Sequence, residues 1–196
     1  MVVGAALLVG GESRRMGRDK SQLLLGGTTF QARLAEMLSD FPERLLSVGR
    51  RTLSVPGFLT VPDLLPDRGP LGALHALLTV CRSEALILVP CDAPLFSREL
   101  ARFLAQAITE EWEAVVPVTR DGRQHPACGV YRKDVLPKLQ AQLRAGNGRM
   151  RDFPASLRTC WLPLADTPFP DRCLTNVNTP QAYDALLAEE QPSSFF

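Results

Sequence analysis

The sequence predicts an α/β protein with three layers, in which helices cover both faces of a mostly parallel sheet. Strand-like and helix-like segments alternate through the first 110 residues, the pattern expected of such a sheet. Residues 2–9 form an apolar run that stops at Gly10-Gly11, and the most apolar run, 85–89, stops at Pro90-Cys91-Asp92. Continuous apolar runs are typical of strands buried on both faces. Together these observations indicate a Rossmann-like architecture.

The segments between these two strands follow the same alternation. Apolar residues recur at helical spacing from Phe30 to Phe41, which predicts the first helix. Residues 45–48 and 58–61 are short apolar runs and are expected to form strands. A second helix is expected just after Gly69-Pro70, because proline is tolerated in the first helical turn.

The third helix is expected to start at Ser97, whose hydroxyl can cap it. Its predicted buried face consists of Leu100, Phe103, Leu104, Ala107 and Ile108. Residues 114–118 and 127–131 are predicted strands joined across the turn Asp121-Gly122. More irregular sequence follows, with one helix expected near 134–145 and a last one capped by Thr179-Pro180. A single domain over 1–190 is the simplest interpretation, with 191–196 as a frayed tail.

Bulk properties exclude several classes of function. The chain has 196 residues, 45% of them apolar, which is ample for one core. Its net charge of +1 provides no global field to attract nucleic acid or an acidic membrane. No apolar run approaches the roughly 20 residues of a membrane helix, and no signal peptide is evident. Five cysteines without C-x-x-C spacing indicate reduced thiols and a cytoplasmic location.

The loop after the first strand has the composition of a phosphate-binding site. It holds three glycines and four cations, the latter being Arg14, Arg15, Arg18 and Lys20. Glycines let backbone N–H groups approach a ligand closely, and cations neutralise a phosphate chain. The loop is not a Walker A motif, since two residues separate Gly17 from Lys20, and it lacks the Gly-x-Gly-x-x-Gly dinucleotide pattern. A strand-to-helix turn with solvated arginines is the simpler alternative.

The same loop has the sequence Leu8-x-Gly-Gly-x-Ser-x-Arg-Met-Gly-x-Asp-Lys20. This pattern resembles the signature of nucleotidyltransferases with a GT-A-like fold, and within that group most resembles the molybdenum cofactor guanylyltransferase family. The resemblance implies that Arg15 and Lys20 bind the phosphates of GTP. It also implies that Leu8, Val9, Gly10 and Gly11 line the nucleotide pocket.

Asp92 is the candidate metal ligand. It follows the central strand, so its carboxylate is expected at the same sheet edge as Gly10-Gly11, the edge where ligands bind in open α/β sheets. Magnesium is usually held by one or two carboxylates together with phosphates and water. Alternatively, Asp92 caps the next turn, a common role of aspartate. The resemblance favours the ligand, because the family places its magnesium aspartate in a context that matches Cys91-Asp92-Ala-Pro94.

Other polar residues are secondary candidates. The resemblance implies that Asp63 contacts the nucleotide, although Asp67 is close enough in sequence to be confused with it, and either can be a solvated turn residue. Asn178, in Asn-Val-Asn-Thr-Pro, matches a family segment that helps hold phosphate or metal, or else it simply precedes the start of a helix. His75 is expected to be packed or exposed within a helix. His125 lies in a region where the family binds its acceptor.

The implied reaction transfers GMP from GTP to the terminal phosphate of molybdopterin with the help of Mg²⁺, releasing pyrophosphate. Molybdoenzymes and cofactor-delivery proteins are further implied partners. Val9 and Ser47 depart from the family's usual alanine and asparagine, while the Gly10-Gly11 pair favours guanine over cytosine. Two alternatives stay open: a cytidylyl- or sugar-phosphate nucleotidyltransferase of the same fold, and a nucleotide-binding module without turnover.

Overall fold

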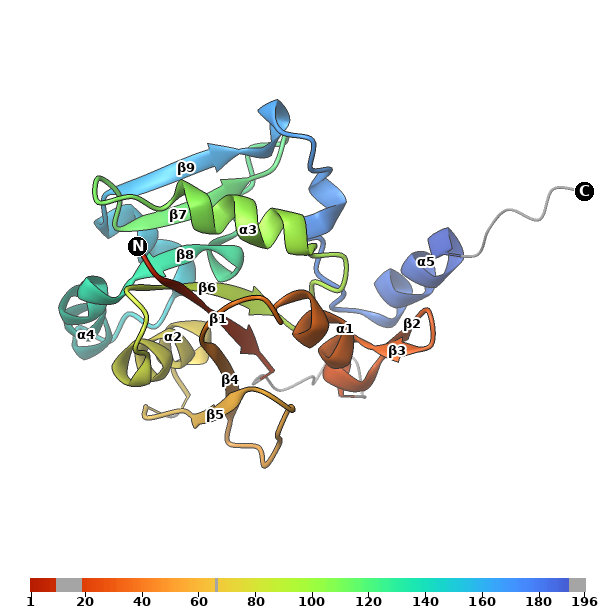
Figure 1. The fold of residues 1–196 in the computed structure, drawn as a ribbon, viewed down its shortest axis with the longest axis horizontal. Coiled ribbons are helices and arrows are strands. Elements are labelled where there is room, and N and C mark those ends of the chain that lie inside the picture. The colour runs from red at the N-terminus through yellow and green to blue at the C-terminus, as the bar shows by residue number, and fades with distance from the viewer. Residues whose placement is uncertain (10–18, 66, 191–196) are drawn as a thin grey trace, which may run out of the picture.

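The computed structural model describes residues 1–9, 19–65 and 67–190. Among these residues, seven strands form one sheet in the order β5-β4-β1-β6-β8-β7-β9, and two more form the small hairpin β2-β3 (Figure 1). The strands are β1 Val3–Leu8, β2 Leu24–Leu25, β3 Thr28–Thr29, β4 Arg44–Gly49, β5 Leu59–Pro62, β6 Ala85–Pro90, β7 Ala114–Val118, β8 Val130–Arg132 and β9 Thr159–Pro163. The α-helices are α1 Phe30–Met37, α2 Gly69–Val80, α3 Arg98–Ala107, α4 Leu136–Arg144 and α5 Pro180–Glu190.

The large sheet is mostly parallel, as the sequence predicts. Only β8 among the described strands of this sheet runs against its neighbours, β6 and β7. In the central register, Leu8 of β1 pairs with Ser47 of β4 and with Pro90 of β6. The carboxyl ends of these three strands are therefore level, and whatever follows them meets at one edge.

Helices cover both faces of the sheet and complete the predicted three layers. On one face, Leu34 of α1 and Leu104 of α3 pack in one cluster with Leu7 of β1. On the other face, Leu74 of α2 and Leu139 of α4 join a second cluster. Alternate residues of β1 belong to the two clusters, which explains why its sequence is apolar throughout rather than alternating.

Helix α3 begins as the sequence predicts, with Ser97 accepting a hydrogen bond from the Leu100 N–H at 3.1 Å. Leu100, Leu104 and Ile108 are buried, but the predicted Phe103 and Ala107 are only half-buried. Ala101 is fully buried in addition, so the face in contact with the sheet is rotated slightly from the predicted one.

Two segments differ from the sequence expectation. The predicted strand 127–131 begins only at Val130, because Pro126–Cys128 form a 3₁₀ turn. Pro126 has no N–H to donate to a strand ladder, and its carbonyl instead accepts a hydrogen bond from the Tyr131 hydroxyl at 2.8 Å. Strand β9 is not predicted, because it lies at the sheet edge, half-buried and ending in Pro163, where the apolar pattern is weak.

Helix α5 lies beyond the edge of the sheet, next to the β2-β3 hairpin (Figure 1). Thr179 caps it as predicted, accepting from the Ala182 N–H at 3.2 Å. The Tyr183 hydroxyl donates to the Leu24 carbonyl at 2.7 Å, and its ring meets Phe30 edge-on. This contact ties helix α5 to the segment that follows Lys20. The expected tail at 191–196 lies outside the described residues.

None of the described helices is both long and apolar enough to span a bilayer.

Candidate functional site

The candidate site lies where β1, β4 and β6 end. Here the Leu8 carbonyl accepts from the Cys91 N–H at 2.9 Å, and the Val9 N–H donates to the Ser47 carbonyl at 2.9 Å. The side chain of Val9 is 2% exposed and packs in the cluster beneath α1 and α3. Its additional methyl groups, relative to alanine, are therefore accommodated by the core. The predicted pocket residues Gly10 and Gly11 and the predicted phosphate-binding Arg15 lie outside the described residues.

Asp92 lies two residues after the end of β6 and is held by a segment from the C-terminal part of the chain. Its carbonyl accepts from the Val177 N–H at 2.7 Å. Its side chain is 19% exposed, and Oδ1 is buried without a hydrogen-bond partner among the described residues. Burial raises the pKa of Asp92 above its ordinary value, and the nearby Lys20 only partly offsets this. A buried carboxylate oxygen without a partner is costly unless a ligand satisfies it.

Lys20 brings a positive charge to this carboxylate. Its ammonium lies 3.7 Å from Asp92 Oδ2 and donates a hydrogen bond to Asn178 Oδ1. The lysine opens a 3₁₀ turn, Lys20–Gln22, just before the hairpin. The structure thus brings together Lys20, Asp92 and Asn178, three candidates that are far apart in the sequence. Asn176 lies two residues before Asn178 in the chain, and its Oδ1 is likewise buried without a partner among the described residues.

The structure separates the two candidate aspartates after β5. Asp63 follows the strand, donates its N–H to the Gly49 carbonyl at 3.3 Å and has a buried Oδ1 without a described partner. Burial raises the pKa of Asp63, and Arg50 opposes this. Asp67 is exposed, and its carboxylate pairs with Arg50 at 2.7 Å. Within the described residues, Asp63 thus has an oxygen free for a ligand, while Asp67 is an exposed residue paired with Arg50.

The two histidines have different surroundings. His75 is buried in α2 with Nε2 3.4 Å from Gln140 Nε2 of α4, so it packs between helices away from the site. His125 lies in the connection from β7 to β8, at the same sheet edge as Asp92. Its Nε2 is 3.5 Å from Thr119 Oγ1. Burial and then the charge of Arg123 lower the pKa of His125. Its predicted acceptor contact stays a prediction.

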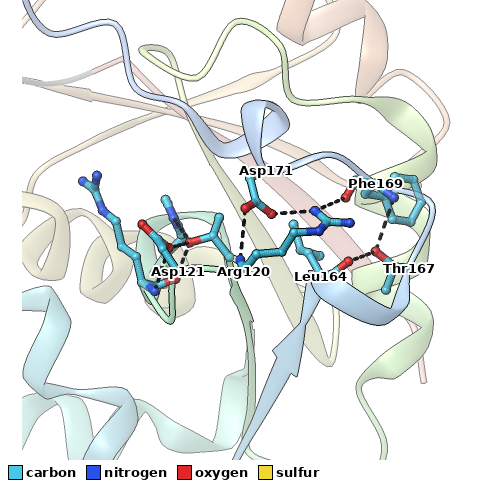
Figure 2. A network of polar contacts seen from close by, with 9 residues as sticks. Arg120, Asp121, Leu164, Thr167, Phe169 and Asp171 are labelled. Carbon is cyan, nitrogen blue, oxygen red and sulfur yellow. Dashed lines mark hydrogen bonds and ion pairs between the residues drawn. The ribbon is translucent and has the colours of Figure 1, made fainter.

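A clamp joins the β7–β8 connection to the segment that leads to the site. Arg120 donates to Asp171 twice, from its guanidinium at 2.9 Å and from its backbone N–H at 3.0 Å (Figure 2). Figure 2 also shows Arg120 reaching toward the Phe169 carbonyl. From Asp171 the chain runs through a 3₁₀ turn to Asn176 and Asn178. The clamp therefore anchors the start of the segment that carries these two asparagines.

Removing this clamp is expected to destabilise the protein modestly. We expect Asp171→Ala to lower the free energy of unfolding by about 1 kcal/mol, since the pair is partly exposed but includes a backbone donor. Asp171→Asn keeps an oxygen acceptor and should cost less than half as much. Urea unfolding measures both values. A loss equal in the two variants would show that the ion pair, rather than the backbone hydrogen bond, supplies the stability.

Two residues at the site are not predicted from the sequence as functional. Asp19 directly precedes the turn that carries Lys20, and Arg51 follows β4. Arg51 Nη1 donates to Asp19 Oδ1 at 2.9 Å across 32 positions in the chain. The pairing of Asp19 with Ser21 two residues later is a recognisable turn pattern. No sequence signal marks Arg51, because its partner is distant.

Comparisons with known proteins agree with this architecture. Residues 5–160 match the family described as MobA-like NTP transferase domain. The chain is 32% identical over 188 residues to the probable molybdenum cofactor guanylyltransferase of Carboxydothermus hydrogenoformans, covering 93% of each chain. It is 33% identical over 180 residues to the molybdenum cofactor guanylyltransferase of Vibrio cholerae, covering 89% of this chain and 86% of the relative.

Solved structures share the fold. Molybdopterin-guanine dinucleotide biosynthesis protein A from Archaeoglobus fulgidus superposes with a TM-score of 0.77 at 20% identity, over 95% of this chain and 97% of that one. The 2-C-methyl-D-erythritol 4-phosphate cytidylyltransferase of Thermus thermophilus has a TM-score of 0.67 at 16% identity, over 94% and 96%. At such identities the likeness concerns the fold alone, and nucleotidyltransferases of more than one base preference share it.

Proposed function

Because the chain belongs to the MobA-like NTP transferase family, we propose that it transfers GMP from GTP to the terminal phosphate of molybdopterin. A phosphate oxygen of molybdopterin attacks the α-phosphorus of GTP, and the bond from that phosphorus to the β-phosphate bridging oxygen breaks. Pyrophosphate leaves with the electron pair. The observation that carries the proposal is the pairing of the Lys20 ammonium with the buried Asp92 carboxylate at the carboxyl edge of the sheet.

The residues at this edge suit a magnesium ion. Within the described residues, no group of three or more His, Cys, Asp and Glu side chains could hold a metal by itself. Magnesium does not require one, since it commonly takes one or two carboxylates and completes its shell with phosphates and water. Asp92 offers a buried oxygen without a described partner, and Asn176 offers a second. Bound magnesium would neutralise charge that develops on the transferred phosphate.

The chain's own residues position and neutralise the substrates. Lys20, joined by Arg15, would bind the phosphates, while Leu8 to Gly11 and Asp63 would contact the nucleotide. The attacking phosphate is already an anion at neutral pH, so no side chain is required to remove a proton. Catalysis then consists of alignment and electrostatic stabilisation, which supply most of the rate enhancement in phosphoryl transfer.

The preference for guanine is proposed from the names of the relatives. The curated relatives at 32% and 33% identity are named guanylyltransferases, while the cytidylyltransferase likeness is confined to the fold. Cytidylyl transfer is therefore the second candidate, and sugar-phosphate nucleotidyl transfer the third. We also propose a cytoplasmic location, which suits the reduced thiols, and delivery of the product to molybdoenzymes.

Pyrophosphate release tests the proposal. Purified protein is incubated with each NTP, with and without molybdopterin, in the presence of magnesium or excess EDTA. We expect release with GTP, molybdopterin and magnesium together, and formation of the guanine dinucleotide by mass spectrometry. Pyrophosphate release with CTP but not with GTP would replace guanylyl by cytidylyl transfer. GTP binding without pyrophosphate release, whether or not an acceptor is present, would identify a binding module.

A further inference from the structure

We infer that Arg51 is a positioning residue for the proposed nucleotidyl transfer, acting through Asp19 to hold Lys20 against Asp92. The inference rests on the proposed function only in that Lys20 is taken as the phosphate-binding lysine. Its structural basis is a continuous chain of hydrogen bonds from the end of β4 to the turn that begins at Lys20.

Asp19 organises that turn. Its Oδ1 accepts from the Ser21 N–H at 3.1 Å and from the Ser21 hydroxyl at 2.8 Å. Its carbonyl accepts from the Gln22 N–H at 3.1 Å. Lys20 lies between the capping residue and the fully buried Ser21, so the path of its backbone depends on this cap. A three-residue turn has little internal stability and relies on such side-chain contacts.

Arg51 anchors the cap to the sheet. Its N–H donates to the Val48 carbonyl at 3.0 Å, which fixes its backbone at the end of β4. Its guanidinium donates to the same Asp19 oxygen that caps the turn, at 2.9 Å. The Arg51 side chain is 31% exposed and the Asp19 side chain 42%, so the pair is only partly screened by solvent. Strand β4 is thereby linked to the backbone that carries Lys20.

Arg51 also neutralises the negative charge of Asp19 beside the proposed phosphate site. Asp19 adjoins the lysine proposed to bind a triphosphate, and an isolated carboxylate there would repel the substrate. Burial alone would raise the pKa of Asp19, but hydrogen bonds from Ser21 and Arg51 lower it, so the carboxylate is ionised and paired at neutral pH. The pairing keeps the acceptor that the turn requires and neutralises its charge.

The expected consequence is a loss of turnover that depends on Asp19. Misplacing a reacting or stabilising group by about 1 Å can cost roughly 100-fold in rate, so we expect Arg51→Ala to lower kcat about 10- to 100-fold. The KM for GTP should change less than kcat. Arg51→Lys, which keeps a cation near Asp19, should recover part of the loss. Arg102→Ala removes an arginine from a surface ion pair with Asp40 and should leave kcat unchanged.

A double-mutant cycle tests whether Arg51 acts on kcat through Asp19. Asp19→Asn keeps an oxygen to cap the turn but loses the charge that binds Arg51, so Arg51→Ala should cost little more in that background. Thermal unfolding of each variant checks that the fold is intact. The inference is overturned if Arg51→Ala leaves kcat unchanged, or if it costs as much in the Asp19→Asn background as in the native protein. Inactivity of the native protein toward every NTP instead refutes the proposed function.

Discussion

Asp92→Asn is expected to reduce GTP-dependent pyrophosphate release about 1,000-fold, because the substitution removes the carboxylate proposed to hold magnesium. A metal ion contributes several kcal/mol of charge stabilisation in such reactions, and roughly 4 kcal/mol corresponds to that factor. Asparagine has nearly the same size, so the fold should be kept. Steady-state pyrophosphate assays measure the loss. The matched control Asp184→Asn, on the exposed surface of α5, should leave kcat as it is.

The same substitution is expected to stabilise the ligand-free protein. Burial raises the pKa of Asp92, so the folded protein binds this proton more tightly than the unfolded chain does. The stability that the protonated group provides is full below the ordinary carboxyl pKa of about 4 and is lost as the pH rises through the raised value. Asp92→Asn has no such loss. Its Tm should match the native Tm in acid and exceed it at neutral pH.

A lower Tm or a retained activity of Asp92→Asn would contradict these expectations. If Asp92→Asn lowers the neutral Tm, the attraction between Asp92 and Lys20 outweighs the cost of burying the carboxylate. If it keeps most of the activity, another group must hold the metal. Isothermal titration of magnesium in the presence of GTP separates these outcomes from a simple loss of nucleotide binding.

Lys20→Ala is expected to lower kcat with GTP about 100- to 1,000-fold, or roughly 3 to 4 kcal/mol. This is the cost of removing one preorganised donor from the charge that develops in a transition state. The Lys20 side chain is 17% exposed and its ammonium already lies beside Asp92 and Asn178, so little reorganisation is needed when phosphate enters. Lys20→Arg keeps the charge but not the shape and should recover only part of the activity.

Lys138→Ala provides the control for Lys20→Ala, since it removes an exposed lysine of α4 that pairs with Glu113. Both variants lose one positive charge, so any general effect of net charge on GTP binding appears equally in both. Native turnover by Lys20→Ala would remove the lysine from the mechanism and would also leave the role of Arg51 without a target.

The sequence predicts the layers and the placement of Asp92 well, and for the same reason. Strands β1 and β6 are buried on both faces, so their apolar runs are long and end sharply at the residues that form the site. Strand β9 gives no comparable signal, because an edge strand is half-buried. The turn at Pro126–Cys128 is missed because its apolar composition resembles that of the strand that follows it.

The site is predicted in its motifs but not in its contacts. Lys20 and Asp92 stand out by motif and position. The hydrogen bond from Lys20 to Asn178, and the one from Arg51 to Asp19, depend on how three strand ends and a returning C-terminal segment meet. Sequence spacing carries no information about such contacts, since the hydrogen-bonded side chains of Lys20 and Asn178 are 158 positions apart. Only the folded chain shows that Asp63 has a buried oxygen without a partner among the described residues, whereas Asp67 pairs with Arg50.

The contact between Lys20 and Asn178 has a consequence during synthesis on the ribosome. At about 5 to 20 residues per second, roughly 8 to 30 s separate the translation of these two residues. Strands β1, β4, β5 and β6 emerge from the ribosome well before residues 176–178, which contact Lys20 and Asp92. A nascent chain that has folded its early strands therefore still lacks the completed site. Competence for GTP should arise only when the last helix has docked on the hairpin.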